Sequence, residues 1–269
     1  MFPLLGRVDE FVDEWGIERK ALMILKRVGN LRMIGETGTG KTHFIHYLCE
    51  KHDLKLWEFS LTSDTERWDL LASDILKEGT TKTREGVILL WLNDPEGGVC
   101  FLDEFNYAQP NVTTLINQLS DFRRSIWVPE LQQRLHRSNK HYLVIAMNPY
   151  EKIGYSGTFQ TNIAQMQRFE SIVFDFLSPK SETKLLLKVY DNYEWVRRLV
   201  EFANKIRGLY RKGELTTPIT TGNLKNYCIF RKEGLEEKEI IEIASSLFLE
   251  EERPVVRRLW EEEEAEKAE

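Results

Sequence analysis

The sequence predicts an α/β domain, with helices flanking a parallel sheet, followed by a small all-α domain. Short apolar runs alternate with segments of helical periodicity, which is typical of a doubly wound sheet. A glycine-rich turn joins the first apolar run to a helix, and after Pro179 only helical patterns remain. We therefore divide the chain into an α/β domain, residues 1–178, and a helical domain, residues 179–269.

Hydrophobic periodicity and turn residues predict the elements of the first domain in order. An amphipathic helix is expected over 9–27, ended by Gly29. A strand over 31–34, a helix over 41–50 and a strand over 54–61 follow. The remaining elements are a helix over 85–93, a strand over 99–102, helices over 110–120 and 161–167, and strands over 141–146 and 171–176.

The second domain is expected to be a small helical bundle. Its predicted helices cover 182–190, 194–210, 223–231 and 235–251. The acidic run over 261–264 gives the domain an acidic C-terminal tail. We interpret this run as the frayed, solvated end of a helix, and an acidic docking tail is the alternative.

Composition excludes several classes of protein. A net charge of −6 argues against a general basic surface for nucleic acid. The three cysteines are too far apart for a metal site or a disulfide framework, and Cys49 and Cys100 lie in apolar runs that predict buried thiols. No apolar run reaches transmembrane length, and residues 1–5 are too short for a signal peptide. These observations together predict an intracellular, cytoplasmic protein.

The turn after the first strand carries a phosphate-binding motif. Residues 35–42 fit the G-x-x-x-x-G-K-T pattern (Walker A), between a predicted strand and a predicted helix as the motif requires. Glycines let backbone N–H groups surround a phosphate, and the helix N-terminus adds positive charge. Lys41 is expected to reach the β- and γ-phosphates, and the Thr42 hydroxyl to ligate Mg²⁺. The predicted nucleotide-binding residues are Gly35, Glu36, Thr37, Gly38, Thr39, Gly40, Lys41, Thr42 and also Asp103.

Two adjacent carboxylates, Asp103 and Glu104, follow the predicted buried strand over 99–102. Because burying both in a core is costly, we expect them to face the ligand crevice at the carboxyl ends of the strands. Asp103 is predicted to hold Mg²⁺ through a water molecule, which makes Thr42 and Asp103 the metal-site residues. Glu104 is predicted to act as the base that polarises the attacking water. A solvated turn is the alternative, and the nearby Walker A motif disfavours it.

Two further residues complete the predicted catalytic set of Lys41, Glu104, Asn148 and Arg168. Asn148 follows a predicted strand and can hold a water beside the γ-phosphate, although an Asn-Pro turn would also explain it. Arg168 can cap a helix, pair with Glu170, or reach the nucleotide of a neighbouring subunit. Taken alone, Arg168 fits a surface salt bridge best.

The segment over 123–141 is locally basic and contains Trp127, a mixture that can contact a nucleic-acid backbone. Residues 132–139 have no strong apolar pattern, so a solvated hairpin or loop is the favoured interpretation. The basic residues concerned are Arg123, Arg124, Arg134, His136, Arg137, Lys140 and His141.

As an ordered set, these motifs resemble the AAA+ ATPases, and within them the MoxR-like group with its CbbQ, NorQ and GvpN branches. The resemblance runs from about residue 5 to residue 249. Besides Walker A, residues 62–65 and 69–71 look like the insert after the second strand of that group, and residues 84–87, 97–98 and 102–108 look like its Walker B region. Residues 146–149 are similar to its sensor 1, and residues 167–169 to the pair that carries the arginine finger.

Three positions depart from the pattern of that group. Ala72 stands where glycine is frequent, and Gln167 where aspartate commonly precedes the finger arginine. Residues 220–224 align with sensor 2 of the lid, where Gly222 replaces an arginine. The lid is therefore expected to sense the γ-phosphate poorly.

The resemblance implies a P-loop AAA+ core with a helical lid, which hydrolyses ATP with Mg²⁺ in a ring, commonly a hexamer. It also implies a chaperone-like remodeller of a protein partner or complex, often one with a von Willebrand A domain. Three alternatives stay open: a nucleic-acid-dependent motor using the segment over 123–141, a nucleotide-dependent assembly switch with weak hydrolysis, and a GTPase of the McrB type. No guanine-reading motif stands out, so ATP is the expected nucleotide.

Overall fold

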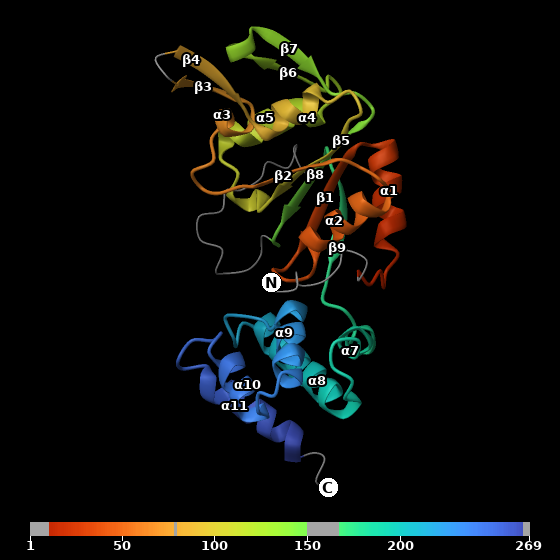
Figure 1. Ribbon diagram of the computed structural model, residues 1–269, viewed down its shortest axis with the longest axis vertical. Coiled ribbons are helices and arrows are strands. Elements are labelled where there is room, and N and C mark those ends of the chain that lie inside the picture. Colours follow the sequence, from red (N-terminus) through yellow and green to blue (C-terminus); the bar gives the residue numbers. More distant parts are fainter. Residues whose placement is uncertain (1–10, 78–79, 150–166, 266–269) are drawn as a thin grey trace. The chain divides into compact units, whose positions relative to one another are not determined.

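The computed structural model describes residues 11–77, 80–149 and 167–265 (Figure 1). Its contacts divide the chain into two compact units, one with nearly all residues up to Phe174 and one with the residues from Asp175 onward. Among the described residues, no helix has both the length and the apolar character needed to cross a membrane. The predicted helix over 161–167 lies, except for Gln167, outside the described residues.

A five-stranded parallel sheet forms the centre of the first unit, with strand order β2-β5-β8-β1-β9 (Figure 1). The strands are β1 (Asn30–Gly35), β2 (Leu56–Ser60), β5 (Gly98–Asp103), β8 (His141–Met147) and β9 (Glu170–Phe174). From β1 the chain crosses the positions of β8 and β5 to form β2 at one edge of the sheet. It later returns to form β9 on the other side of β1. The carboxyl end of β1 is therefore a switch point, where open parallel sheets bind ligands.

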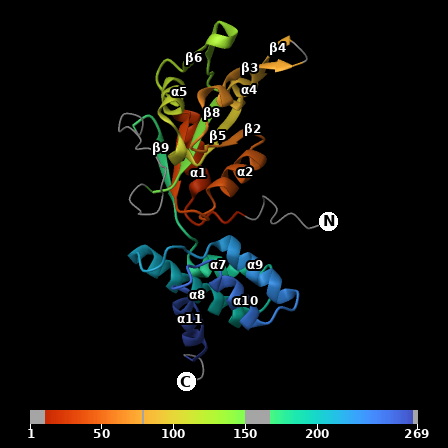
Figure 2. The same cartoon turned by 90° about the vertical axis from the view of Figure 1, so that its left-hand side faces the viewer.

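Helices cover both faces of this sheet, and Figure 2 shows α2 and α5 on opposite sides of it. One apolar cluster packs α1 and α2 on sheet residues such as Leu31 and Phe101, and another packs α4 and α5 on residues such as Cys100 and Leu143. The helices are α1 (Ile17–Arg27), α2 (Lys41–Lys51), α4 (Val87–Asn93) and α5 (Pro110–Ser120). Coverage on both faces explains the continuous apolar runs of β5 and β8, and the predicted α/β fold is confirmed.

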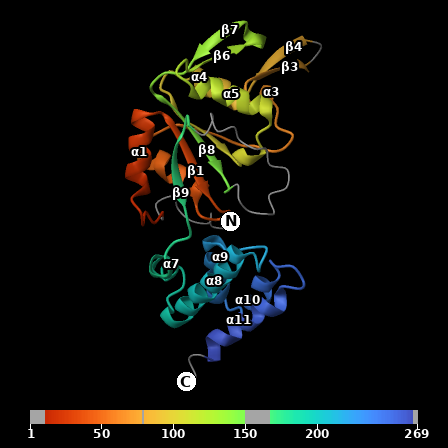
Figure 3. The same ribbon diagram turned by 180° about the vertical axis from the view of Figure 1, so that it is seen from behind.

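The first helix begins at Ile17, well after the predicted residue 9. Gly16 has a left-handed conformation (φ 63°), which interrupts a helix. The Asp13 carboxylate accepts hydrogen bonds from the backbone N–H groups of Ile17 (2.6 Å) and Glu18 (3.1 Å), and so caps the helix start. From there α1 packs beside β1 and β9 (Figure 3).

Two antiparallel hairpins extend the first unit: β3 (Ala72–Lys77) pairs with β4 (Thr80–Glu85), and β6 (Ser125–Val128) with β7 (Gln133–His136). A short helix, α3 (Arg67–Leu70), precedes the first hairpin. Neither β3 nor β4 was expected from the sequence, because their polar composition lacks an apolar strand pattern. It placed the following helix at residue 85, where β4 ends instead. The second hairpin agrees with the interpretation favoured for residues 132–139.

A glycine pair at the start of β5 permits close approach of two other segments. A Cβ atom at Gly98 (φ 128°) would lie 2.5 Å from the carbonyl oxygen of Lys55, and one at Gly97 (φ 73°) would lie 2.4 Å from that of Lys140. No other residue type fits these positions without displacing backbone. The pair thus lets β5 enter the sheet between β2 and β8, with Asp103 at its carboxyl end.

Within its described part, which ends at residue 265, the second unit contains the helices α7 (Pro179–Leu186), α8 (Tyr193–Lys212), α9 (Thr221–Lys232), α10 (Glu237–Ser245) and α11 (Arg253–Ala265). They enclose an apolar core that includes Trp195, Phe202 and Trp260. The helix predicted over 235–251 ends at Ser245, and the acidic run over 261–264 lies at the C-terminal end of a separate helix, α11. Burial of Val256 and Trp260 (4% exposed) anchors α11, whereas Glu261 is exposed.

A buried ion pair connects three helices of this unit. The Arg207 guanidinium donates two hydrogen bonds to the Glu182 carboxylate (2.7 and 2.9 Å) and one to the carbonyl oxygen of Ile219 (2.8 Å). The Thr221 hydroxyl donates to the same carboxylate (2.6 Å) at the start of α9. Since each charge meets its partner, the pair can be buried, and it joins α7 and α8 to the first turn of α9, which contains Gly222.

Candidate active site

The glycine-rich turn lies at the carboxyl end of β1 and leads directly into α2. Gly38 and Gly40 have left-handed conformations (φ 81° and 90°) that other residues rarely adopt. Gly40 is the residue before the helix and has no side chain with which to cap it. The first turn of α2 is thus suited to meet an anion with its backbone N–H groups and the positive end of the helix dipole.

Lys41 is only 8% exposed, which is unusual for a lysine. Its ammonium group donates to the carbonyl oxygens of Gly35 (2.6 Å) and Glu36 (3.0 Å) and to Oδ1 of Asn148 (3.2 Å). Burial lowers the pKa of Lys41, while the nearby carboxylates of Asp103 and Glu104 act in the opposite direction. The cation is therefore held between the glycine-rich turn and the ends of two other strands.

Thr42 and Asp103 bring two oxygen atoms together beside this lysine. The Thr42 hydroxyl donates to Oδ2 of Asp103 (2.6 Å), and Oδ1 of Asp103 accepts from the backbone N–H of Glu104 (2.8 Å). No group of three or more metal-ligating side chains occurs among the described residues. Two protein oxygens next to a phosphate-binding turn nevertheless fit Mg²⁺, because this ion prefers oxygen ligands and usually keeps phosphates and waters among them.

Glu104 has a left-handed backbone (φ 53°), a conformation that non-glycine residues adopt mainly at turns and functional sites. Its carboxylate accepts a long hydrogen bond (3.4 Å) from the side-chain amide of Asn148. Burial and the adjacent Asp103 carboxylate raise the pKa of Glu104, while Lys41 lowers it. A carboxylate with a raised pKa, close to a phosphate-binding lysine, is chemically suited to accept a proton from water.

Asn148 lies between the two groups with opposite charge. Its amide oxygen accepts from Lys41 and its amide nitrogen donates to Glu104, although the residue is only 4% exposed. The five predicted residues Lys41, Thr42, Asp103, Glu104 and Asn148 are therefore in one hydrogen-bonded cluster at the carboxyl edge of the sheet.

The structure adds Asn106, to which sequence reasoning assigned no role. This residue lies in the 3₁₀ helix η2 (Phe105–Tyr107), directly after Glu104, and is 2% exposed. Its side-chain amide donates to the backbone carbonyl of Asn148 (3.1 Å) and accepts from the backbone N–H of Asn148 (2.6 Å). A buried asparagine so close to the acidic pair was the available signal, but its partner lies 42 residues away in sequence.

Arg168 lies at the opposite end of the sheet. It comes just before β9, whose first residue Glu170 pairs with Leu31 near the start of β1, whereas the glycine-rich turn follows the end of β1. The Arg168 guanidinium donates to the carbonyl oxygen of Asn117 in the last turn of α5 (2.9 Å). Of the alternatives from sequence, the structure therefore places Arg168 at a helix end and away from the glycine-rich turn of its own subunit.

The basic segment over 123–141 does not form a continuous cationic surface. Arg137 and His141 are both 4% exposed, and the Arg137 guanidinium donates to Asn30, Leu119 and His141. Arg123 pairs with Asp121 (2.6 Å), and Arg124 donates to Asn139 (2.9 Å). The interpretation of Arg137 and His141 as nucleic-acid contacts is wrong, because both are core residues of the first unit.

Comparison with known proteins agrees with this geometry. The family model for the AAA domain (dynein-related subfamily) matches residues 30–165, just over half of the chain. The denitrification regulatory protein NirQ of Pseudomonas aeruginosa is 28% identical over 177 residues, which cover 65% of this chain and 66% of that protein. Protein NorQ of Paracoccus denitrificans is 29% identical over the same length, which covers 65% of this chain and 63% of NorQ. The chain thus spans slightly less than two thirds of each relative.

A solved structure agrees with the fold. The crystal structure of a proposed ATPase from Cytophaga hutchinsonii has a TM-score of 0.52 and 17% identity, over 94% of this chain and 90% of the other. The relatives NirQ and NorQ are MoxR-type AAA+ ATPases, so the predicted resemblance to that group is confirmed. By its match over residues 30–165, the chain belongs to the AAA domain family, in the dynein-related subfamily.

Proposed function

We propose that this chain binds ATP with Mg²⁺ and hydrolyses it to ADP and phosphate. The observation that carries the proposal is the position of Asn148, whose one side chain contacts both the Walker A lysine Lys41 and the candidate base Glu104. The oxygen and the nitrogen of one side-chain amide thus contact a phosphate-binding group and a proton acceptor, respectively. Membership of the AAA family supports the same activity.

Each residue has a distinct role in the proposed reaction. Lys41 and the N-terminus of α2 bind the phosphates, and Thr42 and Asp103 would hold Mg²⁺, which when bound neutralises charge on the phosphate oxygens. Glu104 orients a water molecule in line with the γ-phosphate and accepts its proton. Asn148 holds the same water and keeps Glu104 near Lys41.

We further propose that the chain works as a ring, in which Arg168 of one subunit completes the site of the next. Arg168 is separated from the glycine-rich turn of its own subunit by the length of β9, about 13 Å for four residue steps. A guanidinium at that end of the sheet can serve only another subunit's phosphoryl group. A ring of this kind would use hydrolysis to remodel a partner protein or complex, and a von Willebrand A domain partner fits the resemblance.

A nucleotide-dependent assembly switch is the second candidate function. It is motivated by Gly222, which stands in the first turn of α9 where the MoxR-like group carries an arginine. A lid without that arginine would respond weakly to the γ-phosphate, and binding would then drive assembly with little turnover.

Two variants test the ATPase proposal together. Lys41→Ala is expected to weaken ATP binding by a factor of roughly 10 to 100, the loss of a charge-assisted hydrogen bond. Glu104→Gln is expected to bind ATP normally and to lower turnover by about 10²–10⁴-fold. Calorimetry with ATP and GTP and a phosphate-release assay measure both effects. Wild-type turnover near zero with intact binding would favour the assembly switch.

The Glu104→Gln variant also tests the remodelling role. Loaded with ATP, it should hold its partner protein, and the partner should co-purify with it and leave when ADP replaces ATP. Lys41→Ala is the control, because it keeps the surface of the chain but is expected to bind ATP much more weakly. Equal recovery of a protein with both variants would contradict a nucleotide-dependent partner.

A further inference from the structure

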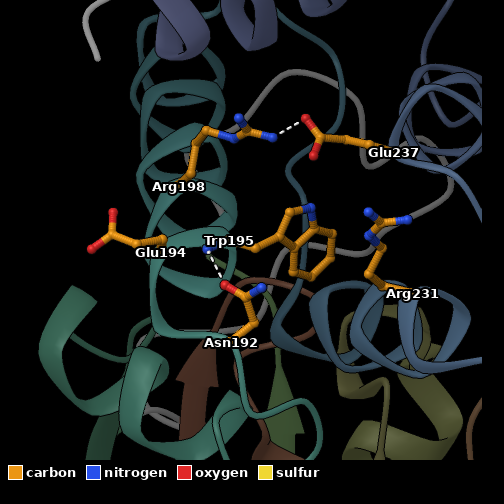
Figure 4. Close-up of a pocket in the computed structure, with 6 residues that line it drawn as sticks. All are labelled: Asn192, Glu194, Trp195, Arg198, Arg231 and Glu237. Atoms are coloured by element: carbon orange, nitrogen blue, oxygen red, sulfur yellow. Dashed lines mark hydrogen bonds and ion pairs between the residues drawn. The ribbon is translucent and has the colours of Figure 1, made fainter. Parts of the chain in front are cut away.

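The helical unit contains a small cavity of its own. It has a volume of about 260 Å³ and lies among the first turns of α8 and α10 and the last turn of α9 (Figure 4). Its lining residues are Asn192, Glu194, Trp195, Arg198, Arg231 and Glu237. Drug-sized ligands and cofactors occupy cavities of roughly 300–1,000 Å³, so this one suits a side chain and not a nucleotide.

An indole N–H group without an acceptor faces this cavity. Trp195 is 6% exposed, and among the described residues no acceptor lies within hydrogen-bond distance of its Nε1. Figure 4 shows this nitrogen directed into the space between Arg198, Glu237 and Arg231. Buried indole N–H groups normally find a partner, and leaving one without a partner costs about 1–3 kcal/mol. The cavity therefore presents a donor that a ligand with a hydrogen-bond acceptor would satisfy.

Two arginines and two glutamates line the cavity, and Arg231 has a longer ion-pair contact than Arg198. Glu237 is neutralised, because its carboxylate pairs with Arg198 and also accepts from the indole N–H of Trp260 (3.1 Å). Glu194 extends away from the cavity in Figure 4, and its side chain is 67% exposed. Arg231 donates to the carbonyl oxygen of Leu235 (2.9 Å), and its guanidinium lies 3.4 Å from the carboxylate of the exposed Glu236.

Two helix N-termini add positive character to the cavity wall. Asn192 and Glu237 stand at the starts of α8, which has 20 residues, and α10, which has 9. The positive ends of both helix dipoles therefore lie at the cavity wall, where they favour an anion. A planar monoanion matches the guanidinium of Arg231 and the indole N–H, and the nearby carboxylate of Glu237 repels it less than it would repel a doubly charged phosphate group.

We propose that this cavity, defined by Trp195, Arg198, Arg231 and Glu237, binds the carboxylate of an aspartate or glutamate side chain from a partner protein. One carboxylate oxygen accepts from Trp195 Nε1, and the other pairs with Arg231. The cavity size restricts the occupant to one side chain, so the rest of the partner segment lies across the helix ends. The helical unit thus has a contact for acidic segments that does not depend on the nucleotide.

The test uses a capped glutamate, acetyl-glutamyl-methylamide, as the probe, with the capped glutamine as its neutral match. The indole ¹H–¹⁵N signal of Trp195, identified among seven tryptophans by its loss in Trp195→Phe, is followed in the full chain without nucleotide. We expect a saturable shift with the capped glutamate, at a Kd on the order of 1–10 mM, and none with the capped glutamine. Arg231→Gln should weaken binding about tenfold or more.

Arg197→Gln is the matched control, because Arg197 lies on the same helix and pairs with Glu201 (2.6 Å) outside the cavity. It should leave the Kd unchanged. An equal response to capped glutamine, or unchanged binding in Arg231→Gln, would overturn the proposal. A saturable shift with inorganic phosphate and none with capped glutamate would show that the cavity binds a phosphate group, and would overturn the proposal of a carboxylate ligand. Acetate binding as tightly as capped glutamate would show a site for small free carboxylates and contradict a polypeptide ligand. None of these outcomes depends on ATP hydrolysis.

Discussion

The side chain of Asn106 and the backbone of Asn148 exchange two hydrogen bonds, one in each direction. Both residues are nearly fully buried, and they tie the segment after β5 to the end of β8. Since the Asn148 side chain contacts Lys41 and Glu104, the position of these groups depends on the Asn106 amide. Asn106 is in this sense a positioning residue, because its side chain acts on Lys41 and Glu104 through the backbone of Asn148.

Asn106→Ala is expected to lower kcat by about 10- to 100-fold, the usual effect of moving a catalytic group by around 1 Å. ATP affinity should change little, because Lys41 and the glycine-rich turn remain. Asn106→Asp keeps the acceptor for the Asn148 N–H and should be intermediate. Steady-state kinetics and nucleotide titration separate the two effects, with the exposed Asn139→Ala as control. Loss of ATP affinity with unchanged kcat would contradict a positioning role.

The pH dependence of turnover should report Glu104. Burial and Asp103 raise its pKa, and a base must be deprotonated to act. Turnover should therefore fall as the pH drops through this raised pKa, at a higher pH than for an ordinary glutamate. The Glu104→Gln variant should lose this acidic limb along with most of its activity. A pH–rate profile of kcat measures this, and an acidic limb that persists in Glu104→Gln would assign it to another group.

Mixing two inactive variants tests the role of Arg168 between subunits. Arg168→Ala should bind ATP and hydrolyse it poorly, because the charge acts mainly in the transition state. Combined with Glu104→Gln, it should recover partial activity, since some interfaces then pair an intact Glu104 with an intact Arg168. Native mass spectrometry must show mixed rings. A mixture without activity, in rings shown to be mixed, would contradict the proposed role unless all sites must act together.

Arg168 also has a contact within its own chain, which needs a separate control. Loss of its hydrogen bond to Asn117 should lower the free energy of unfolding by only about 0.5–1.5 kcal/mol. Denaturant unfolding of Arg168→Ala measures this cost. Arg123→Ala, which removes an exposed arginine of the same region, should keep full activity. Full activity of Arg168→Ala and loss of activity in Arg123→Ala would identify Arg123 as the finger instead.

Arg137 is expected to matter for stability. Its guanidinium satisfies the carbonyl oxygens of Leu119 and His141 and the side chain of Asn30 in the interior. Arg137→Met keeps much of the volume but leaves these acceptors without a donor, so the free energy of unfolding should fall by at least about 3 kcal/mol. Arg134→Met, at an exposed position of the same segment, is the control and should change it by less than about 0.5 kcal/mol. Equal effects of the two variants in urea unfolding would refute this role.

The α/β class, the glycine-rich turn and the acidic pair could all be predicted from the amino-acid sequence. These features depend on neighbours in the chain: a strand, a turn and a helix must follow in order for residues 35–42 to surround a phosphate. Asp103 and Glu104 could be placed because carboxylates at the end of an apolar strand have to leave the core. The family resemblance followed from the order of the motifs along the chain, which can be seen without knowing the fold.

Features that depend on partners far apart in sequence could be recognised only in the folded chain. Arg137 appeared by composition to be a solvated charge, yet it is buried because acceptors from three separate segments surround it. Asn106 acquires its role only from Asn148, and Trp195 faces a cavity only because α8, α9 and α10 meet there. The hairpin of β3 and β4 is held by antiparallel pairing between two polar segments. Because these segments lack alternating apolar residues, their sequence does not identify them as strands. A local pattern reports the surroundings of a residue along the chain, whereas burial and hydrogen bonding depend on which distant segments the fold brings to it.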